Sequence, residues 1–379
     1  MASPASPNDV RIPGRATPES THRYAQRFAE RIAPGHFREI AGGLWASSIG
    51  IGTYLGEPDS VTDRGYTESV VAALQGGFNL VDSAINYRFQ RSERSVGAAL
   101  KQLVASGFSR EELILCTKAG FLTPDGQMPA DPDEYFAQEY LSRQLFRPED
   151  IAQGCHCLSP AFLADQLERS RRNLGIQCVD VFYLHNPETQ LPEVAREEFR
   201  RRIAAAFTLL ESAVSEGKIA AYGMATWNAF REDPKSPSYL SLEEIVSIVR
   251  EAAGQDHHFR FVQLPFNLAM PEALTRPNQI VNGKTMAMVQ AARALGITLI
   301  SSAALLQGQL TKNLPPYVGE ALGLRSNAAL ALQFARSAPG IATALAGMSH
   351  AEHVNANLAL VGIEPAHRDQ FLKLFGPHS

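Results

Sequence analysis

The chain has 379 residues, of which 45% are hydrophobic and 20% are charged, and its formal net charge is −4. This composition is typical of a globular protein with a substantial core, in one large domain or two of ordinary size. The near balance of charges does not favour nucleic-acid binding, and no apolar stretch is long enough for a membrane span. Residues 1–21 lack the apolar segment of a secretory signal. We therefore expect a cytoplasmic protein without nucleic-acid or membrane partners.

The four cysteines do not predict a metal centre. Cys116 and Cys178 fall in apolar, strand-like runs, where a small buried thiol is common. Cys155 and Cys157 flank His156, but this group is too short for a structural zinc site and has no partner pair. We therefore expect no bound metal and a reducing compartment.

Two regions are expected along the chain. Residues 1–36 are predicted to be an N-terminal extension that is partly disordered or helical, with an amphipathic helix near residues 20–32. Residues 37–379 are predicted to form a single domain, which opens with a hairpin about Gly42 and Gly43.

After this hairpin, strand-like and helical patterns alternate to the end of the chain. Strand-like runs occupy residues 47–51, 78–82, 112–117, 178–184, 219–224, 259–264, 297–301 and 342–346. Helical patterns occupy residues 65–76, 91–106, 160–174, 194–216, 241–254, 285–295, 325–337 and 351–360. This alternation predicts an α/β fold, a closed (β/α)8 TIM barrel. The alternative is an open doubly wound sheet, which is disfavoured because no GxGxxG turn follows the first strand.

Two loops depart from this compact alternation. The longer, residues 121–158, is an extended loop after the third strand. In a barrel it would rise over the carboxyl-terminal face, where it could shape substrate choice. The second, residues 266–284, leaves the sixth strand on the same face. The sequence leaves open whether the longer loop is a lid, a subunit contact or a decorated connection.

Polar side chains stand at the ends of three of the predicted strands. Asp82 ends the second run, Lys118 and His185 follow the third and fourth, and Tyr87 comes five residues after Asp82. Because the carboxyl ends of parallel strands carry the chemistry of α/β proteins, we expect these four side chains to lie together. An acid, a phenol, an ammonium and an imidazole are the groups needed to give a proton to a carbonyl oxygen.

The segments around these residues, DSAINY, CTKAG and VDVFYLHNPE, resemble the aldo-keto reductase family, and weaker matches extend the resemblance over roughly residues 37–360. The resemblance implies a catalytic tetrad in which Tyr87 is the proton donor, Lys118 and Asp82 are its electrostatic partners, and His185 orients the carbonyl. An ammonium beside the Tyr87 phenol is expected to lower the pKa of that phenol.

The resemblance also implies a dinucleotide cofactor, NADP or NAD. The residues expected to contact it are Gly52, Thr53, Asp82, Thr226, Gln263, Ser302, Leu305, Gly308, His353 and Asn357. Gln263 would bind the nicotinamide carboxamide, and Asn357 would contact the adenine.

Three departures from the family pattern concern this cofactor site. Ala225 and Thr226 replace the Ser-Asn pair that holds the carboxamide, and Ser302 replaces the aromatic ring beneath the nicotinamide. Gly347 and His353 replace the Lys and Arg that grip a 2′-phosphate. Because histidine is a weaker phosphate clamp than a guanidinium, NADH or dual preference becomes credible.

The resulting hypothesis is an NAD(P)H-dependent oxidoreductase that reduces an aldehyde or ketone, or oxidises the alcohol. Two alternatives stay open: a nucleotide-sensing regulatory subunit on the same barrel, and an enzyme whose retained NAD(H) cycles during turnover. The expected partner is a small carbonyl or alcohol substrate, and a homo-oligomer is left open. The aromatic candidates to line the substrate site are Tyr54, Phe121, Trp227 and Phe266.

Overall fold

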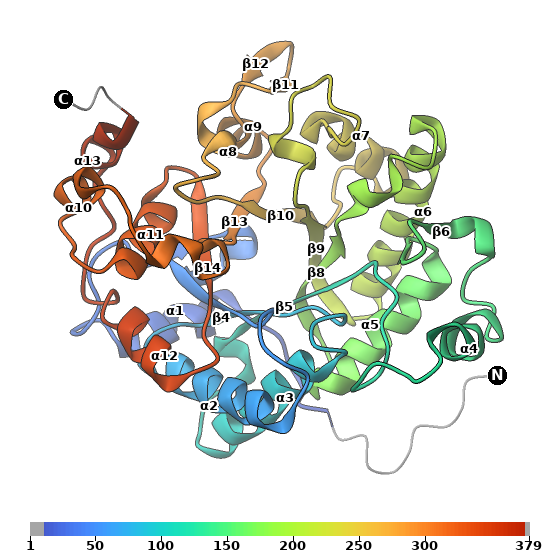
Figure 1. Cartoon of the computed structure of the whole chain (residues 1–379), viewed down its shortest axis with the longest axis horizontal. Helices are drawn as coiled ribbons and strands as arrows, with labels where there is room; N and C mark the ends of the chain where they lie inside the picture. Colours follow the sequence, from blue (N-terminus) through green and yellow to red (C-terminus); the bar gives the residue numbers. More distant parts are fainter. Residues whose placement is uncertain (1–10, 376–379) are drawn as a thin grey trace.

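A computed structural model describes residues 11–375, and its eight central strands form a closed parallel barrel (Figure 1). The strands are β3 (Ile49–Gly52), β4 (Leu80–Asp82), β5 (Ile114–Ala119), β8 (Val179–His185), β9 (Ile219–Ala225), β10 (Phe259–Pro265), β13 (Thr298–Ser302) and β14 (Ile341–Gly347). Because β14 pairs with β3, the sheet has no open edge, and the predicted (β/α)8 barrel is confirmed over the open-sheet alternative.

Helices surround the barrel, and most of them lie between its strands in the chain (Figure 1). They are α2 (Ser60–Gly76), α3 (Arg91–Ala105), α5 (Pro160–Leu174), α6 (Arg196–Ser215), α7 (Leu242–Ala253), α8 (Glu272–Thr275), α9 (Met288–Ala294), α10 (Pro316–Leu322), α11 (Asn327–Ser337), α12 (Ala351–Leu358) and α13 (Arg368–Leu372). Asp59 caps α2 by accepting the Thr62 N–H at 2.7 Å, and Ser241 caps α7. No helix within the described residues is long and apolar enough to cross a membrane.

The strands divide their side chains between two apolar cores. Successive residues of a strand point to opposite faces, so every second residue faces the interior of the barrel. The interior cluster contains Leu80, Ile114, Cys116, Val181, Tyr183, Ala225, Phe261, Ile300 and Leu345. The residues between them, such as Val81 and Leu115, pack against the helices in a larger outer cluster.

The N-terminal segment closes the amino-terminal end of the barrel. Helix α1 (Pro18–Arg27) precedes an antiparallel hairpin of β1 (Phe37–Glu39) and β2 (Trp45–Ser47), which is the hairpin expected about Gly42 and Gly43. Ile40 and Ala46 of this hairpin join the interior cluster. The predicted helix at 20–32 starts earlier because Thr17 caps it. The disorder expected at the chain start concerns residues 1–10, which lie outside the described residues.

The extended loop after the third barrel strand is present, and it has two parts. Its outer part contains α4 (Pro132–Phe136) and a π-helical turn (Ala137–Leu141), and it lies beside α5 at the periphery (Figure 1). There Arg169 of α5 binds Asp165 and Glu139. Its inner part is a short hairpin of β6 (Ile151–Ala152) and β7 (His156–Cys157). This hairpin approaches the carboxyl-terminal end of the barrel, and Phe121, at the start of the same loop, contacts His185 there.

One further difference follows from a turn that the sequence reading overlooked. Lys284–Met286 forms a strand, β12, which pairs with β11 (Gln279–Val281). Asn282 and Gly283 both have positive φ, as a two-residue hairpin turn requires. The helix predicted at 285–295 therefore begins at Met288, after the hairpin.

Candidate active site

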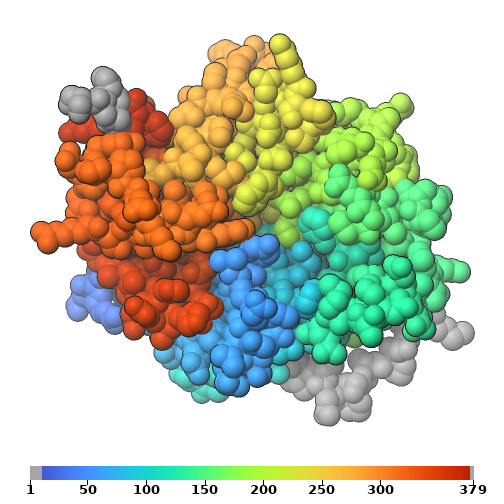
Figure 2. All heavy atoms as spheres, viewed as in Figure 1, coloured from blue at the N-terminus to red at the C-terminus, as the bar shows by residue number. Residues whose placement is uncertain are grey.

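The barrel geometry explains why three of the four tetrad side chains meet. Asp82, Lys118 and His185 each lie two residues beyond an interior residue of the same strand, namely Leu80, Cys116 and Tyr183. They are therefore the last inward-facing positions of β4, β5 and β8. All three side chains are buried at the carboxyl-terminal end of the barrel. In Figure 2 segments coloured blue, green, yellow and orange, from distant parts of the chain, come together around the centre.

Lys118 is the centre of the hydrogen-bond network. Its Nζ donates to Asp82 Oδ2 at 2.5 Å, to the Ser83 carbonyl at 2.8 Å and to the Tyr87 hydroxyl at 3.3 Å. The other oxygen of Asp82 accepts a hydrogen bond from Gln263 Nε2 at 2.7 Å. The ammonium thus has three fixed partners, and Tyr87 is one of them.

The buried ion pair keeps the ammonium charged. Burial lowers the pKa of Lys118, but the charges of Asp82 and Tyr87 outweigh it and leave that pKa above its ordinary value. Burial raises the pKa of Asp82, and the Lys118 charge opposes this rise. Lys118 is therefore cationic at neutral pH, directly beside the phenol.

The pKa of Tyr87 moves in the opposite direction from the one expected. Burial raises it above the ordinary value of a phenol, and the smaller effect of Lys118 lowers it. The expectation of a net decrease is therefore wrong, because the desolvation of the ring outweighs the nearby ammonium. The consequence is a hydroxyl that keeps its proton at neutral pH, while Lys118 stabilises the anion that would remain after proton transfer.

Tyr87 lies in the loop after β4, and the residues that follow it are strained. Arg88, Phe89 and Gln90 all have positive φ, between 47° and 70°. Non-glycine residues in this region cost about 1–3 kcal/mol each and persist only where neighbours hold them. Here Arg88 binds Asp63 of α2 at 2.5 Å, and Gln90 Nε2 donates to the Pro124 carbonyl at 3.2 Å. These contacts fix the loop that carries the phenol.

His185 contributes a neutral imidazole to the same site. Its ring meets the rings of Tyr87 and Phe121 edge to face, with centroids 5.8 Å and 5.1 Å apart. Burial lowers its pKa well below the ordinary value, and the charges of Lys118 and His156 add to that effect. The Nδ1 atom is buried and has no hydrogen-bond partner among the described residues. A neutral imidazole can donate one hydrogen bond to a carbonyl oxygen.

Several residues expected to contact a cofactor surround this network. Thr53 Oγ1 donates to Ser83 Oγ at 2.9 Å, and Thr226 N donates to the Gln263 carbonyl at 2.9 Å. The Thr226 hydroxyl is buried and has no partner within residues 11–375. Ser302 ends β13 and is partly exposed. Gly52 ends β3, next to Gly347 of β14.

The remaining expected contacts form a separate group on the segments after β13 and β14. Leu305 and Gly308 lie in a loop with several residues of positive φ, among them Leu306 and Gln307. Loops of this kind present backbone N–H groups that favour anions. On α12, His353 is exposed and the Asn357 side chain is buried. Among the described residues, the hydrogen bonds of the tetrad do not extend to this group.

Comparison with known proteins places the chain in a family. The model of the aldo/keto reductase family matches residues 48–374. The chain belongs to the aldo/keto reductase family. The match includes all four tetrad residues and all of the expected cofactor contacts.

The individual curated proteins to which the chain is similar are distant relatives. The NADH-specific methylglyoxal reductase of Escherichia coli is 29% identical over 162 residues, which are 43% of this chain and 41% of that protein. The putative voltage-gated potassium channel subunit beta of Schizosaccharomyces pombe is 29% identical over 189 residues, or 50% and 44%. The aligned part therefore spans less than half of the length of these relatives.

Solved structures agree over a larger part of the chain. An aldo/keto reductase from Klebsiella pneumoniae, in complex with NADP and acetate, has a TM-score of 0.60 and covers 89% of this chain and 94% of that one. Its sequence identity is 17%, so this likeness shows the fold alone.

Two residues near the tetrad were missed as site residues by the sequence reading. His156, considered only for a metal, lies on β7 with its Nε2 at 2.8 Å from the His185 carbonyl oxygen. Glu188, in the segment after His185, accepts the Trp227 N–H at 2.7 Å and the Asn228 N–H at 3.1 Å, while its Oε2 is buried without a partner among the described residues. Burial raises the pKa of Glu188 to about 6. The sequence signal for Glu188 was its position just beyond β8, whereas His156 lies within the extended loop and had no such signal.

The aromatic candidates divide into two groups. The Tyr54 ring lies 5.0 Å from that of Tyr87, and both Tyr54 and Trp227 are exposed. Phe121 contacts His185, as described above. Phe266, in contrast, is fully buried and stacks on Phe334, so its assignment to the substrate site is wrong.

Proposed function

We propose that this protein is an NAD(P)-dependent oxidoreductase that reduces an aldehyde or ketone, or oxidises the corresponding alcohol. The observation that carries this proposal is the buried Lys118 ammonium, which contacts both the Asp82 carboxylate and the Tyr87 hydroxyl. Burying a charged group costs free energy, and buried charges of this kind cluster at functional sites. Membership of the aldo/keto reductase family supports the same reading.

The tetrad would divide the work of proton transfer. When bound, a nicotinamide cofactor supplies the hydride that reaches the carbonyl carbon. Tyr87 gives its hydroxyl proton to the carbonyl oxygen as negative charge develops there. Lys118 stabilises the resulting phenolate, which regains a proton from water, and Asp82 holds Lys118 in place. His185 donates a hydrogen bond that orients the carbonyl.

The chain offers side chains for a nicotinamide cofactor. The buried, unpartnered hydroxyl of Thr226 fits a carboxamide, because it can both donate and accept a hydrogen bond. The other residues that would hold the cofactor are Gly52, Thr53, Asp82, Gln263, Ser302, Leu305, Gly308, His353 and Asn357.

The preference between NADH and NADPH is inferred from the residues of the proposed cofactor site near α12. Gly347 and His353 offer no guanidinium or ammonium for a 2′-phosphate, so we expect NADH to bind at least as well as NADPH. Titration of each nucleotide by fluorescence quenching checks this preference. Tighter binding of NADPH than of NADH would contradict it.

One observation favours two alternatives. Ser302 supplies no ring to stack on a nicotinamide, which would suit a nucleotide-sensing subunit with slow turnover, or an enzyme that retains NAD(H). The Schizosaccharomyces pombe relative is named as a channel subunit. Denaturing the purified protein and analysing the supernatant for nucleotide tests for retention.

The proposed activity is tested by following the transferred hydrogen with a deuterium label. Aldehydes and ketones are incubated with NADH or NADPH that carries deuterium at C4, and the alcohols are analysed by mass spectrometry. We expect one deuterium on the carbinol carbon. Bound nucleotide without any turnover across the panel would favour the sensing subunit instead.

A further inference from the structure

The backbone of His185 has a side-chain partner that comes from the extended loop. His156 on β7 is fully buried, and its Nε2 lies 2.8 Å from the His185 carbonyl oxygen. The two residues are 29 positions apart in the chain. The inner hairpin of the extended loop therefore contacts the backbone of His185.

A chain of hydrogen bonds defines which nitrogen of His156 carries the proton. Arg202 of α6 donates to Gln190 Oε1 at 2.5 Å, which directs the Gln190 amide nitrogen toward His156 Nδ1 at 2.9 Å. Nδ1 therefore accepts, and Nε2 carries the proton that it donates to the His185 carbonyl. Burial lowers the pKa of His156 to about 4, so the ring stays neutral at pH 7.

Neighbouring groups tightly enclose the contact between His156 and the His185 carbonyl. Gly120, which follows β5, has a φ of 153°, and a Cβ there would lie 2.8 Å from both His156 Nε2 and the His185 carbonyl oxygen. The Phe121 ring packs edge-on against both imidazoles, with centroid distances of 4.9 Å and 5.1 Å. Backbone pairing secures β7 here, since Cys157 N donates to the Gly120 carbonyl at 2.7 Å.

His185 needs support of this kind. Its own Nδ1 has no partner among the described residues, so no hydrogen bond at this atom holds the ring. The next residue, Asn186, has a φ of 46°, and the strand ends there. Without His156, the peptide at this strand end would lose the side-chain contact that sets its direction.

We propose that His156 is a positioning residue, which fixes the direction of the His185 imidazole through the His185 carbonyl and the shared Phe121 ring. The inference rests on the proposed function, because His185 matters as the group that orients a carbonyl. It assigns a task to the inner hairpin of the extended loop, which nothing else in the site explains.

The main test is His156→Phe. Phenylalanine keeps a ring against Phe121 but removes both hydrogen bonds of the imidazole. We expect kcat to fall about 10–100-fold, because small misplacements of a reacting group have effects of this size. The KM and the dissociation constant of NADH should stay within about twofold, because His156 touches neither site. His156→Gln, which keeps an N–H near the Nε2 position, should recover part of kcat.

His36→Phe is a matched control. His36 is also fully buried, and its Nε2 lies 3.0 Å from a backbone carbonyl oxygen, that of Gly77, at the other end of the barrel. Burial lowers its pKa to about 4, as for His156. Both variants should lose thermal stability, but only His156→Phe should lose kcat. Equal kcat values in the two variants would overturn the proposal.

A readout without turnover separates this inference from the proposed function. In 15N-labelled protein, the His185 ring should give one set of signals in the wild type and in His36→Phe, and several or broadened signals in His156→Phe. If the wild type shows no turnover, the proposed function fails while this measurement still decides the positioning. If His156→Phe does not fold, Gln190→Met replaces it, with a smaller change in the same direction. Unchanged His185 signals in the folded variant would refute the inference.

Discussion

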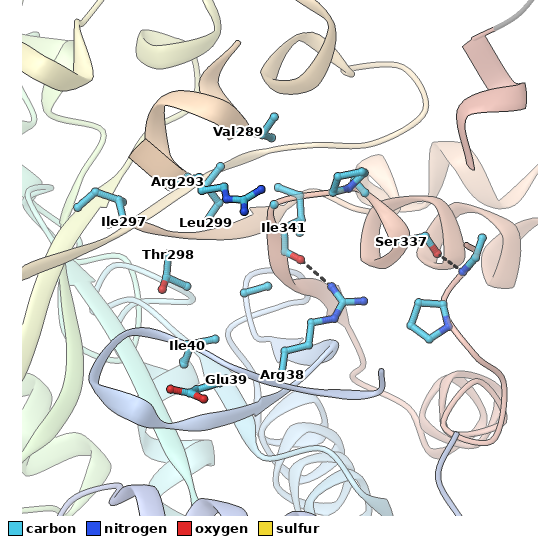
Figure 3. A pocket seen from close by; sticks show the side chains of 16 residues that line it. Arg38, Glu39, Ile40, Val289, Arg293, Ile297, Thr298, Leu299, Ser337 and Ile341 are labelled. Atoms are coloured by element: carbon cyan, nitrogen blue, oxygen red, sulfur yellow. Dashed lines mark hydrogen bonds between the residues drawn. The ribbon is translucent and has the colours of Figure 1, made fainter. Parts of the chain in front are cut away.

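The two ends of the barrel contain buried or partly buried polar groups that have different hydrogen-bond partners. At the amino-terminal end, Arg38 donates to the carbonyls of Ile341 and Arg336 at 2.6 Å and 2.7 Å, beside a surface pocket (Figure 3). Nearby, Arg110 pairs with Asp180 at 2.7 Å. These charges bind backbone or one another and tie the N-terminal segment to the strands.

At the carboxyl-terminal end, buried polar atoms are left without partners. They are His185 Nδ1, Thr226 Oγ1 and Glu188 Oε2, within the described residues. The amino-terminal end has exceptions too, among them Arg336 Nη1 and Arg110 Nε. Because buried polar atoms are nearly always hydrogen-bonded, these three atoms support the proposal that this end of the barrel binds a ligand. The charged groups of the amino-terminal end, in contrast, stabilise the fold, which is the division expected of a TIM barrel.

The largest expected effect comes from breaking the ion pair. Lys118→Met leaves Asp82 buried without its counter-ion, so the free energy of unfolding should fall by about 3–5 kcal/mol. Turnover should fall at least about 100-fold. The double variant with Asp82→Leu should regain part of the stability but no turnover. Urea denaturation and steady-state kinetics measure both, and a loss below about 1 kcal/mol would contradict the assigned pairing.

The amino-terminal end should control stability in acid. The pKa of His36 is about 4 in the folded protein, below its ordinary value of 6.5, so the unfolded chain binds the proton first. Its contribution to stability is complete above pH 6.5 and is lost as the pH falls toward 4. The stability difference between wild type and His36→Phe should shrink by roughly 3 kcal/mol over this range. A constant difference in urea melts at pH 7.5, 5.5 and 4 would be inconsistent with this.

Glu188 should act in the opposite sense at the other end. Its pKa is about 6 in the folded protein and 4.5 ordinarily, so the folded state binds the proton more tightly. This stabilisation is present below pH 4.5 and is lost as the pH rises through 6. Glu188→Gln should therefore gain roughly 2 kcal/mol relative to wild type between pH 4.5 and 7.5.

Glu193→Gln is the control for the pH dependence of the stability of Glu188→Gln. Glu193 also accepts a backbone N–H, from Gln153 at 2.8 Å, but it is exposed. Its substitution removes a carboxylate that accepts the same kind of hydrogen bond without removing a buried one. A parallel shift in both variants would show that burial of Glu188 is not the cause.

The smallest effect concerns the unpartnered hydroxyl of Thr226. Thr226→Val keeps the shape and removes one hydrogen-bonding group, so NADH should bind about 2–10-fold more weakly. The melting temperature should not fall, because the hydroxyl has no protein partner to lose. Fluorescence titration and thermal melting check the two parts. Unchanged affinity would remove Thr226 from the proposed cofactor site.

The sequence predicted the barrel because its apolar runs alternate with helical patterns, and it located Asp82, Lys118 and His185 because each ends such a run. Other features depend on contacts between distant segments. The pKa of Tyr87 is raised by burial among neighbours that no local sequence pattern reveals. His156 reaches His185 through a short hairpin within the extended loop, and Phe266 is buried because it packs against Phe334. The Asn282-Gly283 turn was readable but overlooked.

The central claim is that the Tyr87 hydroxyl supplies the proton in a carbonyl reduction. The direct measurement is the kcat of Tyr87→Phe beside Tyr54→Phe, whose ring is the exposed neighbour of Tyr87, with NADH affinity measured for both. The account predicts that kcat falls about 10²–10⁴-fold in Tyr87→Phe alone, with NADH binding unchanged. Turnover by Tyr87→Phe at the rate of the wild type would contradict it.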